Sequence, residues 1–178
     1  ICATHEPNEE IIKNPEVVVE KLNTLNCSYT ALPYPKNMNF LDINVLDKFI
    51  EDINLAGSIF SKANKVLCYH NHALEFQKIN KEIILERIYN NTDNKYIQGE
   101  PDVYWIQKGG HDPISWCKKL KNRLPLIHLK DFIMLNEQES YYAEIGNGNL
   151  DIKNIIKEAA LSGCKWYIVE QDECQGDP

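Results

Sequence analysis

The sequence lacks the features that would place it in a membrane or in a disulfide-stabilised class. No apolar run approaches the ~18 residues that a bilayer span requires. The six cysteines include no CxxC pair, which favours reduced core thiols of a cytoplasmic protein, although an even count also permits disulfides. The chain opens at Ile1 with neither an initiator methionine nor signal-peptide architecture. We therefore expect no membrane association.

Positive charge is also scarce. The chain has 19 Lys+Arg against 26 Asp+Glu, a formal net charge of −7, which argues against a nucleic-acid backbone as partner. A small, neutral or metal-chelating ligand fits this balance better. With 178 residues, 43% hydrophobic and 25% charged, the composition predicts one globular domain over residues 1–178 and leaves a homo-oligomer open.

Apolar strands alternate with amphipathic helices along the chain. The clearest strand covers residues 66–69 and follows a helix predicted over 41–62, whose apolar residues recur every three or four positions. The alternation repeats about seven times, which is typical of a parallel α/β fold. Further strands are predicted at 1–4, 27–32, 96–105, 125–131, 141–144 and 165–172, and further helices from Pro15 and over 81–89, 114–120 and 151–161. Complete (β/α)8 TIM barrels have about 250 residues, so we expect an incomplete barrel from which one strand and at least one helix, the closing helix among them, are missing.

At or near the C-terminal ends of four of these strands stands a side chain that can bind a metal, namely His70, Asp102, His128 and Glu170. The carboxyl ends of barrel strands meet at one face, where active sites form. Two imidazoles and two carboxylates suit a divalent ion such as Mn²⁺, Zn²⁺, Co²⁺ or Mg²⁺. The alternative for Asp102 and Glu170 is a pair of solvated loop acids. His72 lies two residues beyond His70 and is expected to face the same way.

The ordered motifs resemble one known family. They are Tyr69-His-Asn-His72-Ala-Leu-Glu75-Phe76, Asp102-Val-Tyr-Trp105 with Gly109-Gly110, Arg123 followed by His128-Leu-Lys-Asp131, Gly146-Asn-Gly-Asn149-Leu-Asp151 and Val169-Glu-Gln-Asp172. Together they resemble the sugar phosphate isomerase/epimerase family. That family has the xylose-isomerase-like TIM barrel and includes inosose dehydratases, ketose 3-epimerases and, more distantly, endonuclease IV. The resemblance makes residues 1–5 look like the end of the second barrel strand, which implies that about the first β/α unit is absent.

The resemblance implies a metal site built from a Glu, an Asp, a His and a Glu on four strands. Asp102, His128 and Glu170 match the last three by position, and His70 stands where the first Glu is usual. We therefore expect His70 as the first ligand, with Glu75 as the alternative.

The resemblance also implies the reaction, which is isomerisation or epimerisation of a sugar or keto-sugar, phosphorylated or not, through an enediolate. Glu170 would be ligand and base, and His72 the second acid/base group. Lys130 would hold a substrate oxygen, its alternative being a solvated lysine at a strand end. Substrate contacts are expected from His5, Trp105 and Glu75.

The remaining aromatic and glycine signals are weaker. Trp105 is expected at the barrel mouth, whereas Trp116 and Trp166 are expected in the core. Gly146 and Gly148 lack the strand-GxGxxG-helix context of a phosphate loop, so a simple turn is expected there.

Three alternative functions compete with the isomerase. A dehydratase or lyase acting on an inosose or 3-keto-glycoside would share the enediolate and then expel a leaving group. A nuclease of the endonuclease IV type is disfavoured by the acidic charge and by Trp105, which stands where a further histidine would be needed. A non-catalytic partial barrel that binds a ligand or partner is the third.

Overall fold

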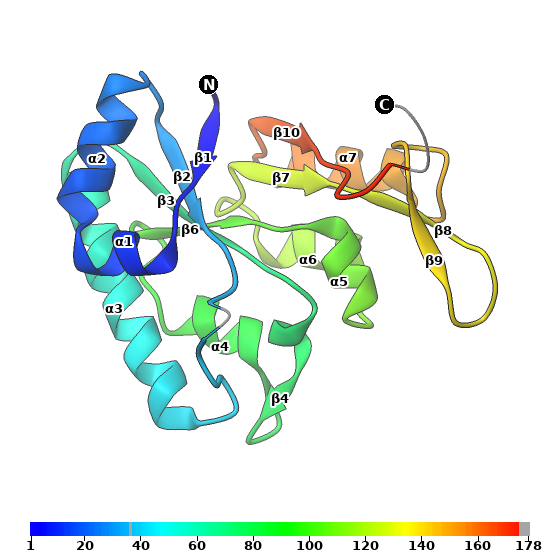
Figure 1. Ribbon diagram of the computed structural model, residues 1–178, viewed down its shortest axis with the longest axis horizontal. Helices are drawn as coiled ribbons and strands as arrows, with labels where there is room; N and C mark the ends of the chain where they lie inside the picture. The colour runs from blue at the N-terminus through cyan, green and yellow to red at the C-terminus, as the bar shows by residue number, and fades with distance from the viewer. Residues whose placement is uncertain (36, 175–178) are drawn as a thin grey trace. The chain divides into compact units, whose positions relative to one another are not determined.

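A computed structural model describes residues 1–35 and 37–174 of the chain. These residues form two compact units that meet in the sequence after Glu100. We call Ile1–Glu100 the N-terminal unit and the chain from Pro101 onward the C-terminal unit (Figure 1). No helix in the described ranges combines the length and the apolar character needed to cross a membrane.

The N-terminal unit is built on a four-stranded parallel sheet with the order β1-β2-β3-β6. Its strands are β1 (Ala3–His5), β2 (Tyr29–Leu32), β3 (Val66–His70) and β6 (Ile97–Glu100). The inner strands are almost wholly buried, which explains why they lack the polar alternation of a half-exposed strand. The strand predicted around residues 66–69 is confirmed, with His70 as its last residue.

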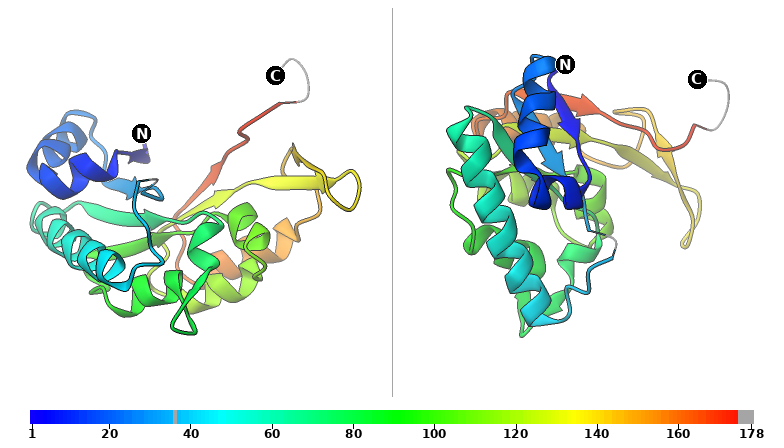
Figure 2. Two further views of the ribbon diagram at one scale, coloured as in Figure 1. Left: turned by 60° about the horizontal axis from the view of Figure 1, so that its bottom comes forward. Right: turned by 60° about the vertical axis from the view of Figure 1, so that its left-hand side comes forward.

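Helices pack against this sheet (Figures 1 and 2). They are α1 (Asn8–Lys13), α2 (Pro15–Thr24), α3 (Ile43–Lys62) and α4 (Ile84–Asn90), and a 3-10 turn η1 (Leu74–Phe76) and a hairpin of β4 (Lys78–Ile79) and β5 (Glu82–Ile83) precede α4. Pro15 occupies the first turn of α2, where its missing N–H costs nothing. Asp42 caps α3 by accepting a hydrogen bond from the Asn44 N–H at 2.9 Å. The apolar face of α3 packs on β3 and β6.

Gly57 lets α3 approach the sheet closely. A Cβ at this position would lie 2.6 Å from the Tyr96 carbonyl oxygen and 2.9 Å from Ile97 Cδ1. The backbone oxygen cannot rotate away, so a larger side chain forces helix and strand apart.

The C-terminal unit combines three helices with two pairs of strands. Its helices are α5 (Val103–Lys108), α6 (Pro113–Lys119) and α7 (Ile152–Leu161), and its strands are β7 (Leu126–Leu129), β8 (Asp131–Met134), β9 (Ser140–Ala143) and β10 (Trp166–Val169). Strands β7 and β10 are parallel, whereas β8 and β9 form an antiparallel hairpin (Figure 2). The segment before α5 joins β7 through a parallel bridge between Asp102 and His128.

Asp131 organises the loop that follows β9. Its buried carboxylate accepts hydrogen bonds from the N–H groups of Phe132, Gly146, Gly148 and Leu150 at 2.9–3.1 Å. A Cβ on Gly148 would collide with this carboxylate. The two glycines therefore belong to a turn, as expected, and here the turn wraps a carboxylate.

The predicted α/β alternation is confirmed, and its errors have local causes. Strand β6 ends at Glu100, because Asp102 caps α5, so Trp105 lies on that helix and not at a strand end. Trp116 is 2% exposed, as expected for the core, but Trp166 is 49% exposed and the prediction for it is wrong. Among the residues of this unit that the structure describes, β10 pairs only with β7, which leaves its other edge without a strand partner there. The hairpins and α1 were not predicted, and the single domain and incomplete barrel stay predictions.

Replacing Gly57 by Ala should destabilise the fold, although Gly→Ala inside a helix normally stabilises by about 1 kcal/mol. The added methyl overpacks the contact with β6, at a typical cost of about 1–3 kcal/mol. A thermal melt should show a lower Tm for Gly57→Ala. The control Ser61→Ala, in the same helix, should leave the Tm unchanged or slightly higher. A raised Tm for Gly57→Ala would contradict the close approach.

Candidate functional site

Three potential metal ligands converge in the C-terminal unit. The ligand atoms of Asp102, His128 and Glu170 all lie within 4.8 Å of one another. Asp102 is the N-cap of α5, His128 belongs to β7, and Glu170 directly follows β10.

Strand register explains this convergence. His128 pairs with Ile168 across the β7–β10 ladder, and the Glu170 N–H continues the ladder by donating to the Leu129 carbonyl at 3.1 Å. On the other side of β7, the His128 N–H donates to the Pro101 carbonyl at 3.0 Å. The three side chains therefore emerge at one end of adjacent parallel segments.

A buried ammonium lies among these side chains. Lys130 is 2% exposed, and its Nζ lies 2.9 Å from Glu170 Oε2, 3.0 Å from Asp172 Oδ1 and 3.5 Å from Asp102 Oδ2. Glu170 Oε2 also lies 3.0 Å from His128 Nδ1. The alternative of a solvated lysine is wrong, and so is a solvated Asp102, which is fully buried. Glu170 is 38% exposed at its side chain.

The surroundings of Asp102 and Glu170 shift the pKa values of these two carboxylates in opposite directions. Burial raises the pKa of Asp102 to about 6, although the Lys130 charge opposes this. The hydrogen bond with His128 holds the pKa of Glu170 well below its usual range, with a further contribution from Lys130. Burial alone would lower the pKa of Lys130, but Asp102, Glu170 and Asp172 outweigh it and raise that pKa. Lys130 is therefore charged at neutral pH.

The donor set fits a divalent cation. One imidazole nitrogen and two carboxylates suit Mn²⁺, Zn²⁺, Co²⁺ or Mg²⁺. With their carboxylates ionised, Asp102, Glu170 and Asp172 carry three negative charges against the single positive charge of Lys130. This leaves a local excess of two negative charges, which a divalent ion would balance.

Aromatic rings border the ammonium. Lys130 Nζ lies 5.7 Å from the Trp105 ring centroid and 5.8 Å from that of Tyr142, within the range of a cation–π contact. Burial and a hydrogen bond to Asp172 raise the pKa of Tyr142, so its hydroxyl stays protonated. Sequence reasoning missed both Tyr142 and Asp172. The only available signal was the position of Asp172, two residues after Glu170.

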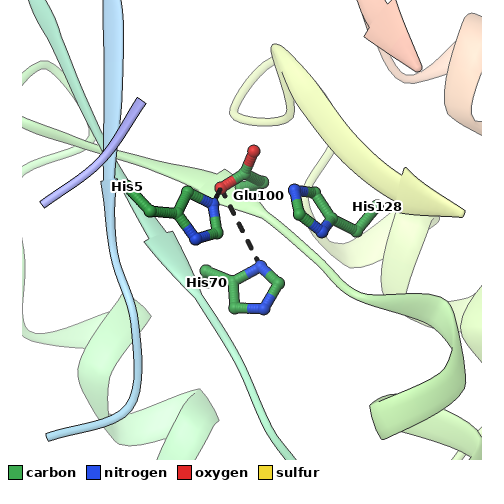
Figure 3. A group of neighbouring side chains, drawn as sticks. All are labelled: His5, His70, Glu100 and His128. Atoms are coloured by element: carbon green, nitrogen blue, oxygen red, sulfur yellow. Dashed lines mark hydrogen bonds and ion pairs between the residues drawn. The ribbon is translucent and has the colours of Figure 1, made fainter. Parts of the chain in front are cut away.

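A second group of side chains meets in the N-terminal unit. Figure 3 shows His5, His70 and Glu100 among its labelled residues. His5 Nε2 lies 2.8 Å from Glu100 Oε2, and His70 Nδ1 lies 3.8 Å from the same oxygen. Glu100 and His70 are buried. Glu100 was missed because the strand was expected to continue to Asp102.

His72 and Glu75 lie next to this group along the chain. The His72 ring centroid is 5.2 Å from that of His70, although β3 ends before His72. Glu75 is fully buried, and its Oε1 accepts hydrogen bonds from the Tyr69 hydroxyl at 3.1 Å and the His72 N–H at 3.0 Å. Burial raises the pKa of Glu75 to about 7.

The predicted site residues are divided between the two units. The N-terminal unit holds His5, His70, His72 and Glu75, and the C-terminal unit holds Asp102, Trp105, His128, Lys130 and Glu170. The roles assigned to these residues stay predictions.

No profile of a known protein family matches the chain. A search of curated proteins finds an inosose dehydratase of Clostridium tetani, which is 26% identical over 145 residues. The match covers 71% of this chain and 47% of the relative, so the chain spans about half the length of that protein.

Solved structures give a broader match. A sugar phosphate isomerase/epimerase from Parabacteroides distasonis is 28% identical with a TM-score of 0.79, covering 98% of this chain and 64% of that one. A xylose isomerase-like TIM-barrel protein from Mycobacterium smegmatis, solved in complex with magnesium, has a TM-score of 0.74 at 11% identity, covering 98% and 67%. The latter likeness concerns the fold alone.

The α/β fold therefore matches these barrels over nearly the whole chain, which spans about two thirds of their length. The resemblance predicted from the strand-end motifs is confirmed. The chain is thus similar to sugar phosphate isomerase/epimerase proteins with the xylose isomerase-like TIM barrel, and to inosose dehydratases.

Proposed function

We propose that the whole protein is a metal-dependent isomerase or epimerase of a sugar or keto-sugar, phosphorylated or not, that acts through an enediolate. The observation that carries this proposal is the cluster of Asp102, His128 and Glu170 around the buried Lys130 ammonium. A small sugar or cyclitol suits a site that combines charged groups with the rings of Trp105 and Tyr142.

Asp102, His128 and Glu170 would hold the metal, for which Mn²⁺, Zn²⁺, Co²⁺ and Mg²⁺ are the candidates. When bound, such an ion polarises a substrate carbonyl and its neighbouring hydroxyl and lowers the cost of the enediolate. The addition of His70 to this ligand set rests on the sequence pattern, because His70 belongs to the N-terminal unit.

Lys130 would control the basicity of Glu170. In the structure, the hydrogen bond with His128, and after it the one that Lys130 donates, hold the pKa of Glu170 well below its usual range and make it a weak base. When Lys130 donates instead to a substrate oxygen, Glu170 would lose the Lys130 part of this stabilisation and its proton affinity would rise. Glu170 would then remove the proton next to the carbonyl, and His72 would serve as the second acid/base group.

The second candidate is a dehydratase or lyase, favoured by the similarity to inosose dehydratase. Proton removal would be the same, but a leaving group on the next carbon would then depart with help from an acid. The cluster in the C-terminal unit serves either outcome.

The test is proton exchange in the full-length protein. Incubated with Mn²⁺ and a panel of keto-sugars and inososes in D₂O, the protein should exchange the proton next to the carbonyl of at least one substrate, as seen by NMR. An epimer as product identifies the first candidate, and an unsaturated product identifies the second. Absence of exchange across the panel would favour the non-catalytic partial barrel.

Glu170→Gln should abolish this exchange, because it keeps the side-chain size but removes the charge needed for ligation and for proton removal. We expect a loss of ~10²-fold or more, together with weaker Mn²⁺ binding in equilibrium dialysis. The control Glu173→Gln changes an exposed carboxylate three residues away and should alter neither. Full exchange in Glu170→Gln would remove Glu170 from the mechanism.

Glu75→Gln should stabilise the protein at pH 8 and change little at pH 5. The folded pKa of about 7 lies above the ordinary value of 4.5, so the native state holds a proton that the unfolded state has lost. Stability is therefore full below about pH 4.5 and falls as the pH rises through 7, by up to about 3 kcal/mol.

Gln carries no charge and therefore avoids the cost of burying one at pH 8. Its side-chain oxygen can still accept hydrogen bonds from the Tyr69 hydroxyl and the His72 N–H. Denaturant titrations at pH 5 and 8 measure the difference, and Glu86→Gln, on the half-exposed side of α4, is the control. A metal analysis of Glu75→Gln checks the alternative ligand role. Loss of metal in this variant, but not in His70→Ala, would make Glu75 the first ligand.

A further inference from the structure

We propose that the N-terminal unit carries a metal site of its own, formed by His5, His70 and Glu100 and suited to a borderline divalent cation such as Zn²⁺ or Co²⁺. The proposal goes beyond the proposed function and does not depend on it. It assigns His70 to a ligand set that the sequence pattern did not predict, with Glu100 as the central carboxylate.

The sheet places the three side chains on one face. His70 on β3 pairs in register with Glu100 on β6, so the two side chains point the same way. His5 on β1 pairs with Ala31 on β2, which in turn pairs with Cys68 on β3. Cys68 lies two residues before His70 and shares its face, so His5 also points to this side.

Ala31 provides the room for this approach. It lies on β2, between the strands that carry His5 and His70, and its side chain is a single buried methyl group. The two imidazole ring centroids are consequently only 4.8 Å apart, although their strands are not direct neighbours. A larger residue at this position would stand between the rings.

The donor atoms have the spacing of a ligand set. The separations from Glu100 Oε2 are 2.8 Å to His5 Nε2 and 3.8 Å to His70 Nδ1. Donors bonded to one ion at about 2.0–2.2 Å lie about 3.0 Å apart in octahedral and about 3.4 Å apart in tetrahedral geometry. The observed separations bracket these values, so small side-chain rotations would bring all three atoms onto one cation.

The donor chemistry selects the kind of ion. Two imidazoles with one carboxylate favour borderline cations, whereas Mg²⁺ favours oxygen ligands. The cluster of Asp102, His128 and Glu170 has the opposite balance, with one imidazole and two carboxylates. The two groups should therefore differ in metal preference. Because three residues leave coordination positions open, the proposed site can also bind water or a ligand oxygen.

The test counts metal ions in the full chain. Metal-free protein is titrated with Co²⁺, and binding is followed by visible absorption and by equilibrium dialysis. Apart from any Co²⁺ bound by Asp102, His128 and Glu170, we expect one further equivalent, which is lost in Glu100→Gln and in His5→Gln but retained in Glu170→Gln. About a hundredfold excess of Mg²⁺ should not displace it. His111→Gln, which removes a histidine outside both groups, should bind as the unchanged chain does.

His5→Gln keeps the test decisive if the buried Glu100 variant fails to fold, because the His5 side chain is partly exposed. Two results would overturn the proposal. One is that His5→Gln and Glu100→Gln bind as much Co²⁺ as the unchanged chain, which would leave a hydrogen-bonded His-Glu-His group without metal. The other is that these variants and Glu170→Gln all lose the same single equivalent, in which case no independent site exists. Since the readout is stoichiometry, failure of the proposed enzymatic function would not affect the outcome.

Discussion

Parallel pairing in register determines where the chemically active side chains of this chain lie. In a parallel ladder the side chains at paired positions share a face, and every strand ends at the same edge. His128 and Glu170 meet because β7 and β10 are paired up to Leu129. His70 and Glu100 meet because they are directly paired across β3 and β6. A slip of one residue in either ladder would turn one partner to the opposite face and dissolve the group.

The charge balance around Lys130 depends on that register. A buried ammonium is tolerated only with nearby anions, and the paired strands supply Asp102 and Glu170 within 3.5 Å. The proposed transfer of the Lys130 hydrogen bond from Glu170 to a substrate oxygen depends on the same charge balance. Any oxygen that takes Lys130 away from Glu170 leaves a carboxylate with higher proton affinity, so substrate binding and base activation become one event in the proposed mechanism. In that mechanism the His128 hydrogen bond would keep Glu170 oriented.

Strand ends could be predicted from the sequence, because apolar runs that stop at His70, His128 and Glu170 are visible without a structure. Glu100 was not, since the segment from Tyr96 to Trp105 was interpreted as one longer strand reaching Asp102, whereas Asp102 caps a helix. Exposure of Trp166 was also beyond sequence reasoning, because the hydrophobicity of a strand does not tell whether its flank is covered. Pairing partners that come from distant segments, such as Asp172 for Lys130, depend on register and not on composition.

Lys130 and Asp131 are adjacent buried charges, and the groups that neutralise or hydrogen-bond them differ in kind. Lys130 is neutralised by side-chain carboxylates of Glu170 and Asp172, which the proposed mechanism would let it exchange for a substrate oxygen. Asp131, the next residue, is held by four backbone N–H groups from β8 and the 146–150 loop, which belong to the fold and cannot move independently of it. Successive residues of an extended segment point in opposite directions, so the fixed partners of Asp131 hold the backbone from which Lys130 extends. The fixed hydrogen bonds of Asp131 on one side of the strand therefore hold in place the backbone from which the Lys130 side chain reaches its carboxylate partners on the other side.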